Sequence, residues 1–475
     1  WTKVCPRPRE KENSPNMPPA NMLGYNVHTA EERAALLAAV GVESTEDLFS
    51  QIPESIRLRR PLAVPGPLSE WELERHFEAL AAALATPRRP LSVLGGGASA
   101  HDIPAVVPAL AGRGEFLTAY TPYQPEMSQG LLRVLHDFQV LMGRLLGLPA
   151  VNCSVYDGAT AMAEMAWMAC LIKDRRRVGV AASIWPDYRR VLETYLRGRE
   201  VSLVELPADA GTGQLDHAAV ERILATQPCA ALIFQTPNRF GVLEPVTRNC
   251  NQAHAAGALA NVNVNPLLLG VARSPGECGA DIVCAEAQPL GIPLSAGGPY
   301  LGAVATHTEY AGSLPGRIVG ELPDIKGEPA LALIAEEREQ HVSRDRATSH
   351  ICSNQALLAL RVVIHLSTLG EQGFREVARL STAKAHALAR KLTSIPGVSR
   401  VHDGPFFNEF LLRLPCPARE LLQHLESRGI LGGIDYSRFD PTVDNQLLVA
   451  VTERHSKADL DRMVAAVHTA LGELA

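Results

Sequence analysis

Two hydrophobic patterns alternate along residues 128–306 and predict strands and helices in turn. Short continuous apolar runs are typical of strands buried in a sheet, whereas apolar positions three and four residues apart indicate a helix with one buried face. Helices are expected at 128–147 and 157–174 and in the segments between the strands. This alternation predicts an α/β fold with a mostly parallel sheet covered by helices. The predicted strands lie at 177–183, 201–206, 229–235, 258–264, 281–287 and 300–306.

The pattern differs before and after this region. Residues 29–90 alternate helical patterns with proline-rich connections, and the clearest helix is expected at 67–85, where Ser69 and Glu72 have capping-box spacing. After residue 350, two long helices precede a β-β-α-β-α order, which predicts a small C-terminal α+β domain. We therefore divide the chain into four regions: a disordered leader or cloning remnant (1–25), an N-terminal helical extension ending in a loop (26–127), a large α/β domain (128–350), and linking helices with the small domain (351–475).

Composition narrows the class of protein without assigning an activity. Of 475 residues, 46% are hydrophobic and 20% are charged, which is typical of a globular protein and excludes a fibrous or disordered chain. No apolar run is long enough to span a membrane, and a net charge of −6 gives no reason to expect nucleic acid or an anionic membrane as a partner. Nine scattered cysteines without a CxxC pair predict neither a disulfide framework nor a metal site, so we expect a reducing, cytoplasmic location.

Two local features bear on possible chemistry. Lysine, which amine catalysis needs, is scarce, with seven residues among the 45 lysines and arginines; only Lys326 lies in a loop of the large domain. Three consecutive glycines, 95–97, follow a short apolar run. The backbone N–H groups of such a run can cradle a phosphate, although a turn that requires positive φ explains the glycines equally well.

Several long strings of the sequence resemble one family. They resemble the subunit 1 (alpha) chains of glycine decarboxylase, the P-protein of the glycine cleavage system, which has the aspartate-aminotransferase-like fold of the fold-type I pyridoxal phosphate (PLP) enzymes. The resemblance runs from about Asn26 to the C-terminus. The strings are EFLTAYTPYQPEMSQGLL (115–132), SVYDGATAMAEMAW (154–167), QTPNRFGVLEP (235–245), GADIVCAEAQPLGIPLSAGGPYLG (279–302), LPGRIVGE (314–321), REQHVSRDRATSHICSNQAL (338–357) and DGPFFNEFLLRLP (403–415).

The resemblance implies an activity that depends on other chains. In this family glycine reacts with PLP and loses its carboxylate as CO₂, and the aminomethyl group passes to the lipoyl arm of the H-protein. The activity is that of a glycine dehydrogenase (decarboxylating), an oxidoreductase. In two-subunit forms the PLP-bearing lysine lies on subunit 2 (beta), so the resemblance implies an alpha2-beta2 heterotetramer.

The residues that a PLP site requires are absent from the matching positions. Gln288 lies where the PLP-bearing chain has its lysine, and an amide cannot form a Schiff base. The segment 258–270 should hold the acid that pairs with the pyridine nitrogen, but it offers Asn261, Asn263 and Asn265. We therefore expect no catalytic residue on this chain alone and PLP held covalently by the partner subunit.

Two segments are candidates for completing the partner's cofactor and substrate site. The first is a loop with several polar tips between prolines, where ligands are often bound; the second is rich in arginines and hydroxyls and precedes a helix, which suits phosphate or carboxylate binding. Loop anchors and an exposed charged helix end are the alternative interpretations. Arg317 lies in another loop and suits either the subunit interface or an anionic substrate. The candidates are Tyr120, Thr121, Tyr123, Gln124 and Glu126 in the first segment, and Arg338, His341, Arg344, Arg346, Thr348 and Ser349 in the second.

Two rival functions stay open at this point. One is a non-catalytic scaffold that only stabilises the PLP-bearing subunit, and the other is a stand-alone PLP aminotransferase or lyase that would use Lys326. Cys352 is interpreted as a buried structural residue, because no base other than His350 or His341 lies near it in sequence. His101 and Asp102 are also not interpreted as a catalytic pair, because residues adjacent in sequence rarely face one another.

Overall fold

The computed structural model describes residues 28–58, 60, 62–84, 90–117, 121–351 and 353–474. The chain forms two compact units, Trp1–Leu84 and Ala85–Ala475. In the first unit, helix α1 (Ala30–Val40) begins at a capping box between Thr29 and Glu32. Helix α2 (Glu70–Leu84) follows a pair of short 3-10 turns, and none of the residues whose burial is described in this unit is buried. Helix α2 therefore confirms the helix expected at 67–85.

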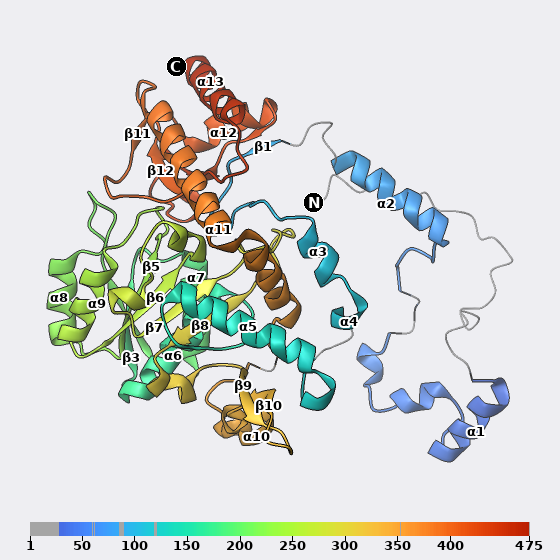
Figure 1. Ribbon diagram of the computed structural model, residues 1–475. Helices are drawn as coiled ribbons and strands as arrows, with labels where there is room; N and C mark the ends of the chain where they lie inside the picture. Colours follow the sequence, from blue (N-terminus) through green and yellow to red (C-terminus); the bar gives the residue numbers. More distant parts are fainter. Residues whose placement is uncertain are drawn as a thin grey trace. The chain divides into compact units, whose positions relative to one another are not determined.

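The second unit is built around a seven-stranded sheet whose strands run in the order β2-β8-β7-β6-β5-β3-β4 (Figure 1). The four pairs from β4 to β7 are parallel, whereas β8 pairs antiparallel with both β7 and β2. The sheet is thus mostly parallel, as predicted. Its strands are β2 (Ala150–Val151), β3 (Arg177–Ala181), β4 (Ser202–Leu206), β5 (Ala231–Thr236), β6 (Leu259–Val264), β7 (Ile282–Glu286) and β8 (Gly302–Thr306).

The helices expected between the strands are present and pack on this sheet. Helix α6 contacts β6, β7 and β8, and its first nine residues are buried, because it lies between the sheet and helix α7. Helix α9 packs on β5 and β6. The helices are α5 (Gln129–Leu146), α6 (Gly158–Lys173), α7 (Pro186–Arg197), α8 (His217–Thr226) and α9 (Val246–Ala255).

The two helices expected after residue 350 are present and are joined in one element, α11 (Ala356–Thr393), with a kink where Gly370 takes the non-helical angles φ 61° and ψ −177°. The region after the sheet departs from the prediction in two places. A hairpin of β9 (Ile318–Pro323) and β10 (Pro329–Ile334) was not predicted, nor were the two-residue strands β13 (Ile430–Leu431) and β14 (Ile434–Asp435). Strands β13 and β14 are too short to give a pattern, whereas β10 is an apolar run that the sequence interpretation missed.

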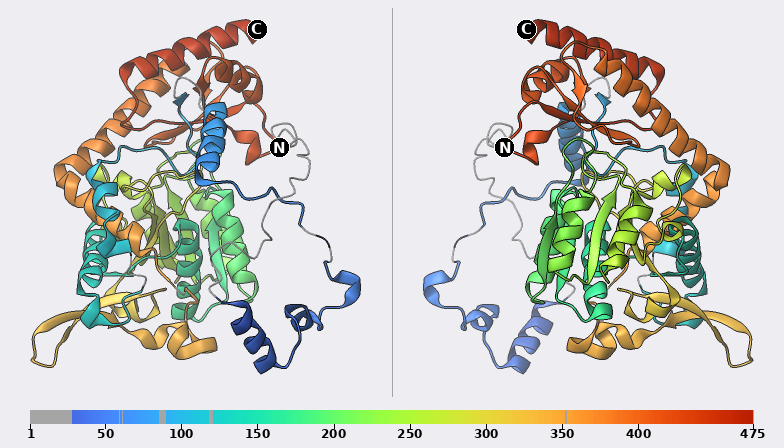
Figure 2. Two further views of the ribbon diagram at one scale, coloured as in Figure 1. Left: turned by 90° about the vertical axis from the view of Figure 1, so that its right-hand side faces the viewer. Right: turned by 90° about the vertical axis from the view of Figure 1, so that its left-hand side faces the viewer.

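The small C-terminal sheet has the order β11-β12-β15-β14 and is antiparallel. Strand β1 (Leu91–Ser92) pairs in parallel with β13, so residues that precede the large sheet in sequence join the small domain (Figure 2). The remaining elements here are β11 (Ser399–Arg400), β12 (Glu409–Arg413), α12 (Ala418–Ser427), β15 (Gln446–Ala450) and α13 (Lys457–Leu474).

Two general expectations can be compared with the structure. Within the described ranges, no helix combines the length and the apolar character that crossing a membrane requires. Five of the described cysteines are buried, as expected for small apolar side chains: Cys153, Cys170, Cys229, Cys250 and Cys284.

Candidate functional site

Gln288 lies just after β7 and is a structural bridge. Its side chain is 1% exposed. The amide Nε2 donates to the carbonyls of Ser99 (3.1 Å) and Ile292 (2.9 Å), and Oε1 accepts from the Ser99 N–H at 3.3 Å. Donors and acceptor are all used, so this amide joins the glycine loop to the turn after β7 and has no free group for chemistry.

Glu286, at the end of β7, places its own carboxylate at the N-terminus of helix α6, where an anion could otherwise bind. One oxygen accepts from the N–H of Gly158, the first residue of α6, at 2.8 Å; the other accepts from the N–H groups of Gln288 (3.0 Å) and Leu301 (3.2 Å). A helix N-terminus favours negative charge, because its first N–H groups lack intrahelical partners. Burial nevertheless raises the pKa of Glu286 to about 7. An external phosphate at this end of α6 would meet an occupied position.

The three glycines form a second cradle that is also filled. The Gly96 N–H donates to Oε1 of Glu409 at 2.8 Å, and both Gly96 and Gly97 have φ of +93°. A Cβ atom at Gly95 would lie 2.0 Å from the same oxygen. The prediction that this glycine turn requires positive φ is therefore confirmed. The group that the loop binds is the side chain of Glu409, and burial raises the pKa of this carboxyl.

The space left between these groups is too small for PLP. The cavity measures about 30 Å³, whereas sites for drug-sized ligands occupy ~300–1,000 Å³. Asn263 lines it with a buried, unpartnered Nδ2, so the position lacks the carboxylate that a pyridine nitrogen needs. The pocket does not fit the cofactor. It is lined by Gly97, Trp185, Tyr188, Gln235, Pro237, Asn263, Val264, Asn265, Glu286, Pro289, Asn408 and Glu409.

The two segments predicted to complete a partner's site meet around Arg317. Nη2 of the buried Arg317 donates to the hydroxyl of Tyr123 at 2.7 Å, and its guanidinium lies over the tyrosine ring. Glu339 is 3.7 Å from Nε of Arg317, and the His341 ring packs edge-on against Tyr123 at 5.5 Å between centroids. Burial raises the pKa of Glu339, although Arg317 and His341 oppose the rise. Nε and Nη1 of Arg317 and Oε1 of Glu339 have no hydrogen-bond partner.

Arg338 and the hydroxyl residues after it are tied to the body of the chain. The buried Arg338 guanidinium donates to the carbonyls of Ala335 and Gly316, each at 3.0 Å, and to that of Leu314. Ser349 hydrogen-bonds the buried Glu164, while the buried Oγ1 of Thr348 has no partner. Arg338 thus holds the loop in place, and the hydroxyls of Thr348 and Ser349 face the interior.

The other predicted residues are distributed as follows. Tyr120 and Cys352 lie outside the described residues. Gln124, Glu126, Arg344 and Arg346 are exposed, and Thr121 is half-buried. His101 pairs with Glu453 at 2.8 Å and not with its neighbour Asp102, which supports its structural interpretation. Lys326 lies exposed in the β9–β10 turn and does not line the cavity beside Gln288.

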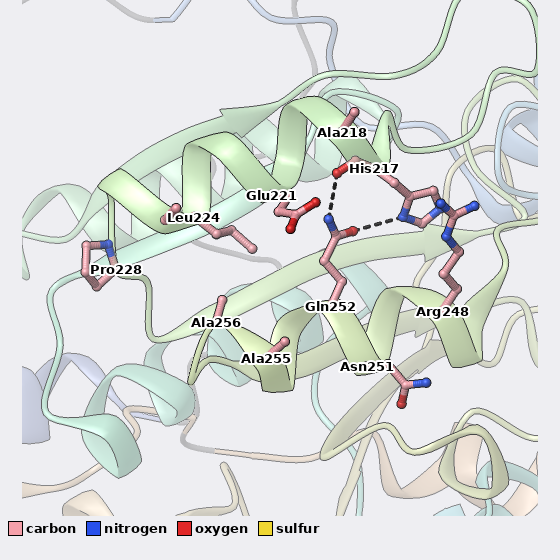
Figure 3. A pocket seen from close by; sticks show the side chains of 11 residues that line it. His217, Ala218, Glu221, Leu224, Pro228, Arg248, Asn251, Gln252, Ala255 and Ala256 are labelled. Carbon is pink, nitrogen blue, oxygen red and sulfur yellow. Dashed lines mark hydrogen bonds between the residues drawn. The ribbon is translucent and has the colours of Figure 1, made fainter.

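A separate groove of about 770 Å³ lies between α8 and α9 (Figure 3). His217 and Gln252 close one part of it, since Oε1 of Gln252 accepts from Nδ1 of the His217 ring at 2.9 Å and Nε2 of Gln252 donates to the His217 carbonyl at 2.7 Å. Glu221 and Arg248 are its charged lining residues. None of the predicted site residues lines this groove.

The family model described as "Glycine cleavage system P-protein" matches residues 24–467. The chain belongs to this family. It is 45% identical over 443 residues to the probable glycine dehydrogenase (decarboxylating) subunit 1 of Desulfitobacterium hafniense, covering 93% of this chain and 99% of that protein. It is 44% identical to the protein of the same name from Moorella thermoacetica, with 93% and 98% covered.

Solved structures agree with the assignment to the P-protein family. An inhibitor-bound glycine decarboxylase (P-protein) of the glycine cleavage system matches with a TM-score of 0.83 and 39% identity, covering 94% of this chain and 99% of that one. A sphingosine-1-phosphate lyase from Burkholderia pseudomallei matches with a TM-score of 0.64 at 13% identity, which shows the shared fold alone. The P-protein family is PLP-dependent, and the words "subunit 1" imply a partner subunit in a split P-protein.

The sequence interpretation missed the residues that close the pocket. Glu286 ends the otherwise apolar strand β7, and Glu409 precedes the apolar run of β12; a carboxylate beside such a run is the signal that could have identified them. Their partners, the N–H groups of Gly158 and Gly96, are more than a hundred residues away, so no local pattern pairs them.

Proposed function

We propose that this chain is the alpha subunit of a glycine dehydrogenase (decarboxylating) and acts only in a complex with subunit 2. One observation carries the proposal: the chain belongs to a PLP-dependent family, yet its own pocket has Gln288 in place of a lysine and about 30 Å³ of space. The cofactor must then be held by another chain. Bound PLP supplies an electron sink that makes loss of CO₂ from glycine possible.

The residues of this chain act at the edge of the partner's site. Tyr123, Gln124, His341 and Arg344 are exposed and offer donors and a positive charge to a carboxylate or phosphate. Buried Arg317 orients the Tyr123 hydroxyl through the 2.7 Å hydrogen bond. Thr121, Thr348 and Ser349, with Tyr120, complete the proposed set. Beyond this site, we propose an alpha2-beta2 assembly, transfer of the aminomethyl group to the lipoylated H-protein, and a cytoplasmic location.

Co-expression with subunit 2 tests the proposal. The complex should exchange the carboxyl group of glycine with labelled CO₂, whereas either chain alone should not. Tyr123→Phe and Arg344→Met should each lower the exchange rate at least tenfold without loss of assembly on size exclusion. Arg222→Met, which removes an exposed arginine of helix α8, is the matched control and should leave exchange unchanged.

The two rivals give different results in the same experiment. If both site variants assemble and retain full exchange, the chain is a scaffold for the PLP-bearing subunit. If the isolated chain binds PLP and borohydride fixes it on Lys326, the chain is a stand-alone enzyme and the proposal is overturned.

A further inference from the structure

The hairpin of β9 and β10 extends from the large domain and leaves its outer half uncovered (Figure 2). Every residue from 321 to 329 is exposed, and Ile325 at the tip is 102% exposed. Leu322, on the strand before the turn, is 48% exposed. A two-stranded hairpin is marginally stable in water unless it packs on another surface, so this half of the hairpin has apolar side chains with nothing to pack on.

The hairpin is nevertheless held in one direction at its base. Two glutamines of α5 pair with the outward-facing peptide groups of the two strands. Gln139 accepts from the Val319 N–H at 2.8 Å and donates to its carbonyl at 3.1 Å, and Gln129 pairs in the same way with Leu331, at 3.2 and 2.8 Å. Each glutamine thus pairs with backbone groups that an additional strand would otherwise bind. One such residue is blocked on each edge of the hairpin, Val319 on β9 and Leu331 on β10.

The turn itself is also fixed and does not require an apolar residue. The Gly327 N–H donates to the Asp324 carbonyl at 3.0 Å with Gly327 at φ +83°, and Asp324 Oδ1 accepts from the N–H groups of Lys326 (2.7 Å) and Glu328 (2.9 Å). This is a type I turn closed by a glycine bulge. Asp324 and Gly327 define the turn, so the Ile325 side chain is displayed by it and plays no part in forming it.

The base of the hairpin is continuous with the proposed shared site. Strand β9 begins one residue after Arg317, which holds Tyr123, and β10 ends two residues before the 3-10 turn that contains Arg338. A partner protein that contacts the residues around Arg317 and Tyr123 would therefore also lie beside the hairpin.

We propose that the β9–β10 hairpin is a docking arm for the second P-protein subunit, which receives Ile325 and Leu322 in an apolar recess. The proposal rests on the proposed function, because that function supplies the partner. Glu321, Asp324 and Glu328 against Lys326 give the tip a net negative charge, so the rim of the recess carries arginine or lysine side chains. An exposed isoleucine on a rigid turn is an anchor of the kind that dominates interface affinity when buried.

The test uses the full chain co-expressed with subunit 2. Ile325→Asp should weaken association at least tenfold by titration on analytical size exclusion, whereas Ile325→Leu should stay within threefold of the wild type. A shortened hairpin, in which Asn-Gly replaces residues 323–329 so that Leu322 and Ala330 keep their pairing, should lose at least as much as Ile325→Asp. All three variants should unfold at the wild-type temperature, because the altered residues are exposed.

The possible results separate this inference from the proposed function. Association of Ile325→Asp and of the shortened variant with wild-type affinity overturns the docking arm and leaves the proposed function intact. Failure of the wild-type chain to associate with subunit 2 overturns both. Hydrogen exchange of residues 321–329 should become slower only when subunit 2 is added. Self-association of the isolated chain that Ile325→Asp abolishes identifies a second copy of this chain as the occupant and overturns the inference.

Discussion

The carboxylate of Glu286 accepts a hydrogen bond from the backbone N–H of Gly158 at 2.8 Å, which places a side chain of β7 on the first residue of α6. Both groups are buried. This contact occupies the anion-binding end of the helix from inside the protein. It gives a physical reason, beyond the missing lysine, why this pocket does not fit PLP.

Glu286 should make the stability of the chain depend on pH in a defined direction. The folded state keeps the proton up to a pKa of about 7, whereas the unfolded chain releases it near the ordinary value of 4.5. The folded state therefore binds more protons between these values, and the free energy of unfolding falls as pH rises through them, by about 3 kcal/mol in total. In Glu286→Gln this component is absent. Urea denaturation at pH 5 and pH 7.5 should show a smaller decrease for the variant, and equal decreases would contradict the assignment.

Restoring a lysine should not restore cofactor binding. In Gln288→Lys the new amine would replace the hydrogen bonds to Ser99 and Ile292, but Glu286 would still occupy the end of α6 and the cavity would still measure about 30 Å³. We expect no borohydride-stable PLP adduct at position 288 by mass spectrometry after incubation with the cofactor. A stoichiometric adduct there would show that the pocket opens readily.

Arg317 and Glu339 should be strongly coupled. Both are buried, and removing one leaves the other charge without compensation, which costs roughly 3–5 kcal/mol for buried pairs. Arg317→Met should therefore destabilise the chain by about 3 kcal/mol. The double variant Arg317→Met/Glu339→Leu should lose less than the sum of the single variants. Additive losses in a double-mutant cycle would mean that the 3.7 Å pair contributes no coupling.

The two glutamines of α5 should differ in their effect on the hairpin. Gln139→Leu leaves the N–H and carbonyl of the buried Val319 unpaired, at a cost of ~1–3 kcal/mol for such groups. Gln129→Leu frees the same groups of Leu331, which is only partly buried, so water replaces the lost bonds. Urea denaturation should therefore show a larger loss in the free energy of unfolding for Gln139→Leu than for Gln129→Leu, and equal losses would contradict this difference.

The framework of the large domain was predictable because its signals are local. Each of the six expected strands appears within two residues of its predicted start. Five of them are buried along nearly their whole length, as strands covered on both faces are, whereas the edge strand β4 is largely uncovered. The start of helix α6 was also predictable, because Asp157 caps its first turn. The β9–β10 hairpin is less regular: β10 is an apolar run, but β9 contains Gly320 and Glu321 and its outer half is exposed, so the pairing of the two strands has no clear local signal.

The sequence by itself determined the family, the absence of a lysine at position 288 and the residue types of the two proposed contact segments. These properties are carried by residue identity and local pattern. Only the tertiary structure decided that Glu286 and Glu409 fill the two anion cradles, that Arg317 joins Tyr123 to Glu339, and that Arg338 is bonded to backbone carbonyls. The contacts of Glu286, Glu409 and Tyr123 link residues more than a hundred positions apart in the chain. The contacts of Arg317 with Glu339 and of Arg338 with Gly316 follow from the pairing of β9 with β10, which brings the two ends of the hairpin together.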